Sequence, residues 1–143
     1  MAQEIVVSGG SLLDLQGERP ADLLIAEGCI ADIGSPGAFV GRGIEVDASD
    51  ALVMPGFVDI QVHFRTPGGE DSEDIASGAA GAALGGVTAC LMMPNTVPTI
   101  DNPELVSEVL ALGRDTPCDV YTSAAITVDR AGERLVDFPA LYE

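Results

Sequence analysis

The character of the sequence changes at residues 55–68, which read PGFVDIQVHFRTPG. Residues 56–64 alternate with a period of two, and this alternation predicts a β-strand that ends in a loop through Pro67. A helix is expected from about Ser72 to Leu84, followed by a second, apolar strand over residues 87–92. Strand, helix and strand joined by short loops are typical of a parallel sheet or of a barrel.

The alternation of strand and helix continues toward the C-terminus. Asn102 is expected to cap a helix, with Pro103 in its first turn and Gly113 at its C-terminal end. Residues 118–126 predict a third strand, and residues 137–143 have the pattern of the start of another helix. Three such units are too few for an eight-stranded barrel, which takes about 200 residues or more. A fragment of a barrel is therefore favoured over a compact three-stranded domain.

The part of the chain before Pro55 has a different pattern, because it reads as short strands separated by turns. Apolar runs at residues 22–26 and 29–34 flank Glu27-Gly28, which signals a two-residue hairpin since glycine accepts the positive φ of such turns. Further strands are expected at residues 4–8, 44–47 and 51–54. The sequence therefore divides into an all-β part, residues 1–54, and an alternating β/α part, residues 55–143.

The charge of the chain excludes several classes of partner. Its 143 residues carry 23 acidic side chains against six arginines and no lysine, which gives a formal net charge of -17. Such a surface repels phosphate backbones and anionic lipid headgroups, so nucleic-acid and membrane-surface roles are excluded. With 47% hydrophobic residues the chain is nevertheless able to bury a core, unlike a disordered acidic tail.

The sequence favours a cytoplasmic protein. Residues 75–100 carry no charge and are long enough to span a bilayer, but Gly85-Gly86 and Pro94 interrupt the run, so no membrane span is expected. Residues 1–5 lack the basic and apolar regions of a secretory signal. The three cysteines show no CxxC spacing, which favours a reducing compartment, and Cys90 is expected to be a small buried hydrophobic residue.

Candidate functional side chains lie at the end of the first strand of the β/α part. Gln61, His63 and Arg65 are two residues apart, so they point to the same side of an extended strand. Catalytic groups of βα barrels lie at this carboxyl end of the strands. His63 is therefore a candidate metal ligand, although spacing alone also allows a structural histidine.

These residues also carry a resemblance to a known family. Residues 55–68 resemble the cyclic amidohydrolase signature PGxxDxHxHxRxPG, and Met93-Pro94-Asn95-Thr96 resembles the MPNT motif of the second barrel strand. Arg65 together with Asn95 makes the chain most similar to the dihydroorotases. The resemblance implies an α/β fold, in which residues 1–54 are part of a small β-sandwich. Residues 55–143 would be the first three βα units of a truncated TIM-type (β/α)8 barrel.

The resemblance also implies roles for individual residues. His63 would be a zinc ligand, while Arg65 and Asn95 would hold the carboxylate of dihydroorotate or carbamoyl-aspartate. Asp59 would contact a metal-ligating side chain and orient it without binding the metal itself. Each residue has a plainer interpretation, because Arg65 could form a surface salt bridge, Asn95 could shape a turn, and Asp59 could make a buried hydrogen bond at the strand end.

Two departures from the family pattern limit the metal binding and catalysis expected of this chain. Gln61 stands where the first histidine of HxH is expected, and a neutral amide oxygen is a poor zinc ligand. The resemblance places the other metal ligands, and the aspartate that acts as general base and acid, in later strands. No catalytic residue is therefore expected within these 143 residues, and the chain alone is predicted neither to bind zinc tightly nor to hydrolyse dihydroorotate.

The resemblance implies a reaction and leaves two alternatives open. The implied reaction is reversible, zinc-dependent hydrolysis of the cyclic amide of a small-molecule substrate, dihydroorotate, in pyrimidine biosynthesis, by an enzyme that could form homo-oligomers. The first alternative is a non-catalytic scaffold for aspartate transcarbamoylase, which the loss of one histidine at Gln61 favours. The second alternative is a relative of the allantoinases or hydantoinases.

Overall fold

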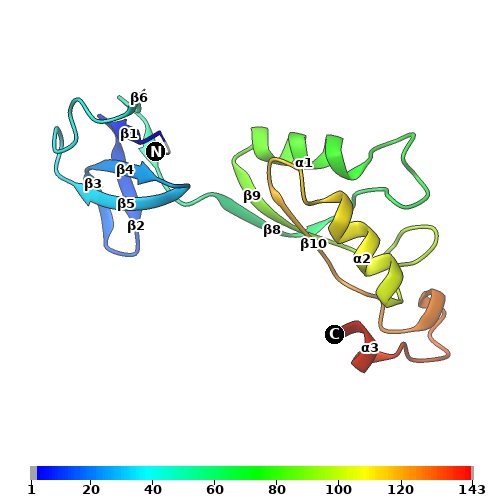
Figure 1. The fold of residues 1–143 in the computed structure, drawn as a ribbon. Helices are drawn as coiled ribbons and strands as arrows, with labels where there is room; N and C mark the ends of the chain where they lie inside the picture. Colours follow the sequence, from blue (N-terminus) through cyan, green and yellow to red (C-terminus); the bar gives the residue numbers. More distant parts are fainter. Residues whose placement is uncertain (1–2, 143) are drawn as a thin grey trace. The chain divides into compact units, whose positions relative to one another are not determined.

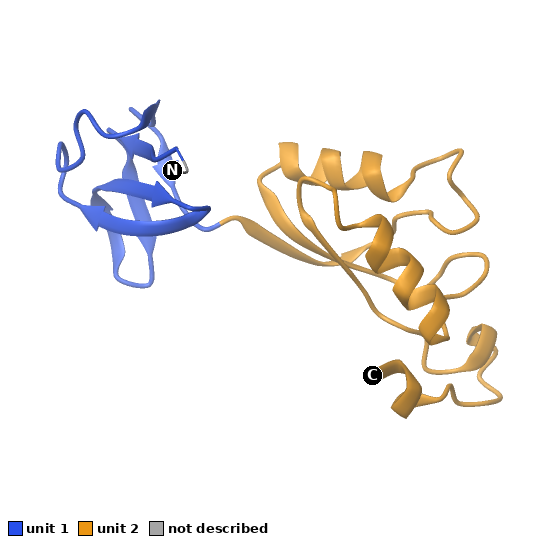
Figure 2. Ribbon diagram, viewed as in Figure 1, with its two compact units in different colours: residues 1–55 blue, residues 56–143 orange. Residues whose placement is uncertain are grey.

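The computed structural model describes residues 3–142 and divides the chain into two compact units, residues 1–55 and residues 56–143 (Figure 2). Met1, Ala2 and Glu143 lie outside the described residues. Met1 and Ala2 belong to residues 1–5, which lack the pattern of a secretory signal, and Glu143 is the last residue of the expected C-terminal helix. Each unit has its own hydrophobic core, so each is described by itself.

Unit 1 consists of strands in two sheets (Figure 1). The four-stranded sheet has the order β5-β4-β1-β6 and the three-stranded sheet has the order β3-β2-β7. The strands are β1 (Ile5–Ser8), β2 (Ser11–Asp14), β3 (Gly17–Pro20), β4 (Asp22–Ala26), β5 (Cys29–Gly34), β6 (Ile44–Asp47) and β7 (Leu52–Val53). The expected hairpin is confirmed, because β4 and β5 pair antiparallel around Glu27 and Gly28, which both have positive φ, 53° and 76°.

The two sheets of unit 1 meet through neighbouring residues of β4. Leu23 and Leu24 follow one another along the strand and therefore point to opposite faces of the sheet. Leu24 packs with Val6 and Phe39, whereas Leu23 packs with a second cluster that includes Leu12 of the other sheet. Burial on both faces of β4 is consistent with the expected β-sandwich architecture.

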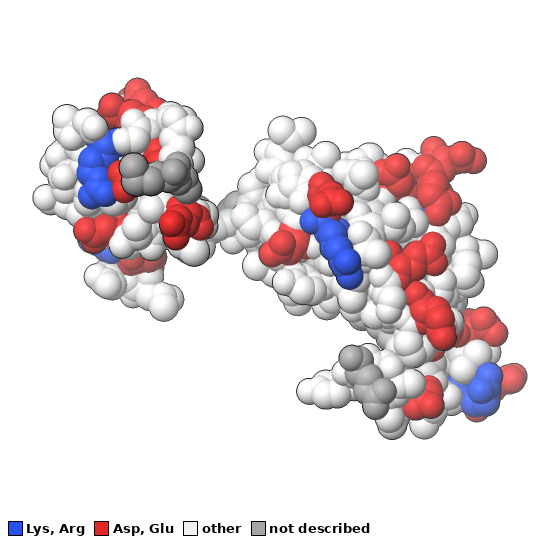
Figure 3. Space-filling model, in the orientation of Figure 1, with Lys and Arg blue, Asp and Glu red and all other residues white. Residues whose placement is uncertain are grey.

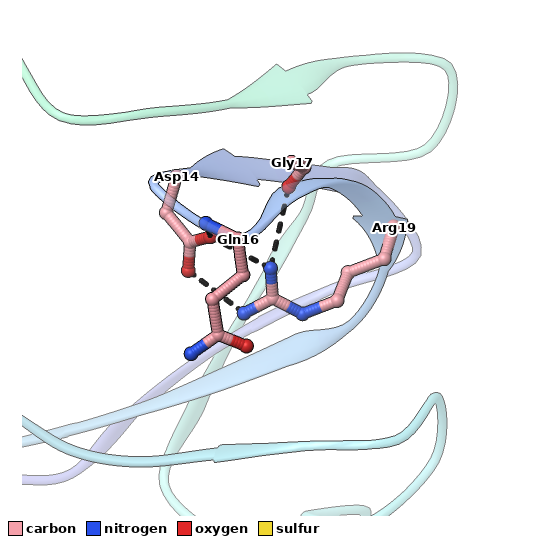
Figure 4. A network of polar contacts seen from close by, with 4 residues as sticks. All are labelled: Asp14, Gln16, Gly17 and Arg19. Carbon is pink, nitrogen blue, oxygen red and sulfur yellow. Dashed lines mark hydrogen bonds and ion pairs between the residues drawn. The ribbon is translucent and has the colours of Figure 1, made fainter.

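One hairpin of unit 1 was not expected from the sequence. β2 and β3 pair antiparallel from Ser11 with Pro20 to Asp14 with Gly17. The residues of β3 are polar or conformationally special, so apolar alternation gives no sign of a strand. Arg19 donates to both carboxylate oxygens of Asp14, each at 2.7 Å, and the Gln16 backbone N–H donates to the same carboxylate at 2.8 Å (Figure 4).

These contacts change the titration of Asp14. The hydrogen bond from Arg19 favours the charged carboxylate most, and with the backbone N–H of Gln16 it lowers the pKa of Asp14 to about 2. The unfolded chain has an aspartate pKa of about 3.9. Because the folded pKa is the lower one, the stabilisation is complete above about pH 4 and is lost as the pH falls toward about 2.

We expect Arg19→Gln to raise the pKa of Asp14 toward the ordinary aspartate value, because the guanidinium that favours the carboxylate is removed. The measurement is an NMR titration of the side-chain carboxyl carbon between about pH 1.5 and 6. Arg42→Gln is the matched control, since Arg42 pairs with Glu4 and does not contact Asp14. An Asp14 pKa that is unchanged in Arg19→Gln would contradict this assignment.

Unit 2 contains a three-stranded parallel sheet of order β10-β9-β8, and helices pack against one face of this sheet (Figure 1). Its regular elements are β8 (Phe57–Val62), α1 (Ile75–Leu84), β9 (Val87–Met92), α2 (Pro103–Leu112), β10 (Asp119–Thr122), a 3-10 turn (Val128–Arg130) and α3 (Phe138–Tyr142). The bounds of β9 and α2 are those expected from the sequence, and Asn102 caps α2 by accepting from the backbone N–H of Leu105 at 3.0 Å.

Two boundaries in unit 2 differ from expectation. Helix α1 begins at Ile75 rather than near Ser72, because Asp74 and Ser77 form a reciprocal capping box at its start. Strand β10 ends at Thr122, although the apolar pattern continues to residue 126. Ser123 still donates to the carbonyl of Met92 in β9 at 2.9 Å, and beyond it Ala125 donates to the backbone carbonyl of Ile100, so the segment passes from the sheet to a loop contact.

The core of unit 2 lies between its sheet and its helices. Met92 and Ala79 are fully buried, and Cys90 is 1% exposed, as its apolar surroundings predicted. Burial, together with the Cys118 sulfur at 4.0 Å, raises the pKa of the Cys90 thiol to about 11. Among the described residues all three cysteines are free thiols, in agreement with the absence of a disulfide framework.

The surface agrees with the composition. Acidic side chains are spread over the visible face of each unit, and basic side chains appear at only a few places (Figure 3). No helix within residues 3–142 is long and apolar enough to cross a membrane. In unit 2, β8 is an edge strand whose Val58 and Ile60 side chains are 64% and 72% exposed.

Candidate functional site

The candidate residues lie where β8 and β9 end. His63 and Arg65 follow β8, and Asn95 follows β9. The two strands are parallel neighbours, and the backbone N–H of Met93 donates to the carbonyl of Val62 at 2.9 Å, which keeps the strand ends together. Parallel pairing therefore brings loops that are about 30 residues apart in sequence to the same edge of the sheet.

His63 and Asn95 contact each other directly. The imidazole Nδ1 atom lies 2.9 Å from the Oδ1 atom of Asn95, across 32 residues of sequence. His63 is exposed and Asn95 is half-buried. Asn95 thus does more than shape the turn after Pro94, because its amide oxygen reaches the neighbouring loop.

Arg65 and Asn95 line one pocket of about 150 Å³. The other lining residues come from the same two loops, namely Pro67, Gly68, Gly69, Thr96 and Val97. Within residues 3–142 the ion pairs are Arg19 with Asp14 and Arg42 with Glu4, both in unit 1. Arg65 therefore carries a positive charge at this pocket without a carboxylate partner among the described residues.

The two loops that form the pocket are tied together by their backbones. The N–H of Val97 donates to the carbonyl of Pro67 at 3.1 Å. Gly68 has a φ of +90°, and a Cβ atom added there would lie 1.8 Å from the carbonyl oxygen of Val97. Only glycine permits this close approach, so Gly68 contributes to the site through its lack of a side chain. The Pro67-Gly68 pair after the strand is the sequence signal of this contact.

Asp59 and Gln61 lie on β8, before the loop. A carboxylate oxygen of Asp59 accepts from the backbone N–H of Gln61 at 2.9 Å, and both residues are exposed. The Asp59 carboxylate therefore contacts its own strand and is not placed against His63. This contact differs from the plainer interpretation of Asp59, a buried hydrogen bond at the strand end, because Asp59 is exposed and lies within β8.

The donor set of the site supplies only part of a zinc centre. His63 offers one imidazole, and Gln61 offers a weak neutral oxygen, whereas zinc takes three or four protein ligands. No group of three or more His, Cys, Asp or Glu side chains within residues 3–142 is placed to hold a metal ion. His63 fits the role of one ligand, and a complete centre needs ligands from outside this set.

Comparisons with known proteins agree on one family. Residues 50–143 match the family model described as dihydro-orotase-like. The chain is 40% identical to a dihydroorotase of Pelobacter propionicus and 42% identical to one of Streptococcus pyogenes serotype M3, each over 97% of this chain. It is 42% identical to a dihydroorotase of Mycobacterium tuberculosis over 85% of this chain. The chain spans 34%, 33% and 28% of these three relatives.

Solved structures with a similar fold include hydantoinases. The L-hydantoinase of Arthrobacter aurescens superposes with a TM-score of 0.77 at 25% identity, over 89% of this chain and 28% of that protein. A D-hydantoinase superposes with a TM-score of 0.72 at 24% identity, over 87% of this chain and 27% of that protein. These likenesses describe the mixed α/β fold.

Proposed function

This chain belongs to the dihydroorotase-like family, and from that premise we propose that it is the N-terminal part of a cyclic amidohydrolase that interconverts dihydroorotate and N-carbamoyl-L-aspartate. The observation that carries the proposal is the pocket that Arg65 and Asn95 line together, beside His63. A cationic fork and an amide next to the one imidazole of the chain are a suitable arrangement for a ring that bears a carboxylate.

Arg65 and Asn95 have complementary tasks in this proposal. The guanidinium of Arg65 presents parallel N–H donors, which match the two oxygens of a carboxylate. The Oδ1 atom of Asn95 is engaged with His63, so its Nδ2 group is the part of the amide left to donate to the substrate. Together they would fix the ring in one orientation, which lowers the entropy cost of reaction at the amide bond.

His63 would hold zinc through its imidazole, with Gln61 as a weak neighbour at the position of the other expected histidine. When bound, such a metal polarises the ring carbonyl and lowers the pKa of a coordinated water. The remaining ligands and the proton-transferring carboxylate would come from strands beyond β10, which complete a (β/α)8 barrel. Among residues 3–142 no strand pairs with the outer edge of β8, and Val58 and Ile60 of this strand are exposed, which supports this completion because a closed barrel leaves no edge. We place the whole enzyme in the cytoplasm, in pyrimidine biosynthesis.

A second candidate function rests on Gln61. Loss of one histidine from the metal-binding pair favours a protein that keeps the fold without the reaction and acts as a scaffold for aspartate transcarbamoylase. Such a scaffold would co-purify with the transcarbamoylase and contain no zinc. Hydantoinase activity is a weaker candidate, because Arg65 is suited to a carboxylate that hydantoin rings lack.

The test compares the protein purified from its natural source with the chain of residues 1–143. We expect the natural protein to hydrolyse dihydroorotate and to lose this activity with a chelator. The 143-residue chain should neither hydrolyse dihydroorotate nor retain zinc in equilibrium dialysis, because one imidazole and one amide cannot hold the metal tightly. Chelator-sensitive turnover by the 143-residue chain would contradict this prediction. A zinc-free, inactive natural protein bound to a transcarbamoylase would instead support the scaffold.

A further inference from the structure

We propose that Asn95 is a positioning residue that holds His63 in the tautomer with the proton on Nδ1, so that Nε2 presents its lone pair. This inference deepens the proposed function, because the free Nε2 atom is the one that a metal ion would use. It assigns to Asn95 a task that is separate from binding the substrate carboxylate.

The assignment of the tautomer rests on this contact. A neutral imidazole has one N–H, and the two ring nitrogens differ in which of them carries it. The Oδ1 atom of Asn95 is an acceptor, and it lies 2.9 Å from Nδ1 of His63. With this oxygen as the acceptor, a neutral His63 carries its proton on Nδ1, and Nε2 is left unprotonated. In free imidazole side chains the opposite tautomer, with the proton on Nε2, is the more common one.

The position of Asn95 is fixed by its own loop. The hydroxyl of Thr96 donates to the carbonyl of Pro98 at 2.7 Å, and the N–H of Val97 donates to the carbonyl of Pro67 at 3.1 Å. Thr96 is also buried. The half-buried Asn95 therefore stands on a backbone that is anchored on its C-terminal side. An amide held in this way can orient an imidazole that is itself exposed.

The side-chain amide of Asn95 also has an Nδ2 group, and the direction of Nδ2 follows from that of Oδ1. With Oδ1 turned to His63, Nδ2 is the end available to the pocket that Asn95 shares with Arg65. One side chain would thus set both the ligand atom of His63 and a donor to the substrate. This arrangement explains why an amide is suited to the position, since a carboxylate could accept from His63 but could not donate to an anion.

The experiment uses the fact that the chain contains a single histidine. In the 15N-labelled chain without metal, a long-range 1H–15N correlation spectrum at about pH 9 reports one neutral imidazole. We expect a protonated Nδ1 and an unprotonated Nε2 signal. In Asn95→Leu the acceptor is lost, so the proton should return largely to Nε2. In Asn95→Asp an acceptor oxygen remains, so the proton should stay on Nδ1.

The outcomes separate this inference from the proposed function. A proton on Nε2 in the unaltered chain, or a proton that stays on Nδ1 in Asn95→Leu, would overturn the inference and leave the hydrolase proposal standing. Unchanged backbone amide signals of β8 and β9 verify that the variants are folded. In the natural protein, Asn95→Leu should also lower zinc affinity by about 10- to 100-fold, the usual effect of losing the partner of a ligating histidine.

Discussion

Replacing Arg65 with alanine in the natural protein should raise the KM for dihydroorotate about tenfold to a hundredfold. A hydrogen bond to a charged group contributes about 1.5–3 kcal/mol, and the fork of Arg65 would make such bonds to the substrate carboxylate. Arg65 lines the pocket with Asn95, and no carboxylate among the described residues pairs with it. The charge is thus free to serve an anionic ligand.

Three comparisons sharpen this measurement. Arg65→Lys should fall between the unaltered protein and Arg65→Ala, because lysine keeps the charge and loses the planar fork. Arg114→Ala is the matched control, since it removes an exposed arginine from the same unit at the end of α2 and outside the pocket. A cyclic amide without a carboxylate should be turned over equally by all of these variants. Equal KM values for dihydroorotate in Arg65→Ala and Arg114→Ala would sink the carboxylate assignment.

The second large effect is expected for Gly68→Ala, which should destabilise unit 2 by about 3 kcal/mol. Its φ of +90° is strained for any residue with a side chain, at a cost of about 1–3 kcal/mol. The added Cβ would also lie 1.8 Å from the Val97 carbonyl oxygen, so one of the two loops must move. Movement would weaken the hydrogen bond from Val97 to Pro67, which contributes about 1 kcal/mol.

Urea unfolding followed by backbone amide signals of unit 2 measures this change. Gly81→Ala is the control, because Gly81 lies within α1 and a Cβ there would meet no atom within 4 Å. That variant should be more stable by about 0.5–1 kcal/mol, since alanine favours a helix over glycine. If Gly68→Ala were as stable as Gly81→Ala, the close approach of the two loops would not exist in solution.

Local patterns were enough to predict much of the fold. The Asn102 cap, Pro103 and Gly113 determine α2 because each acts within one turn of the helix end. The hairpin at Glu27-Gly28 follows from the positive φ that its turn requires. By contrast, β3 is polar and becomes a strand only through its pairing with β2, which no periodicity in its own residues records.

The sequence also named the residues of the candidate site, but it could not state their contacts. Spacing grouped Gln61, His63 and Arg65 on one side of a strand, and the family resemblance paired Arg65 with Asn95, but each residue also had a plainer interpretation. The ion pairs of the described residues lie elsewhere, so the structure gives Arg65 no salt bridge. For Asp59 the described contact is with the backbone of its own strand.

The sequence by itself therefore determined the family, the alternation of strands and helices after Pro55, and the chemical types available at the ends of β8 and β9. Only the tertiary structure decided that the Asn95 oxygen meets Nδ1 of His63 and that Arg65 shares a pocket with the same amide. The physical reason is the distance along the sequence over which each interaction acts. Periodicity and capping act over a few neighbouring residues, whereas this contact joins loops 32 residues apart. Its geometry depends on the register of two parallel strands and on the approach of Gly68 to Val97, which exist only once the chain has folded.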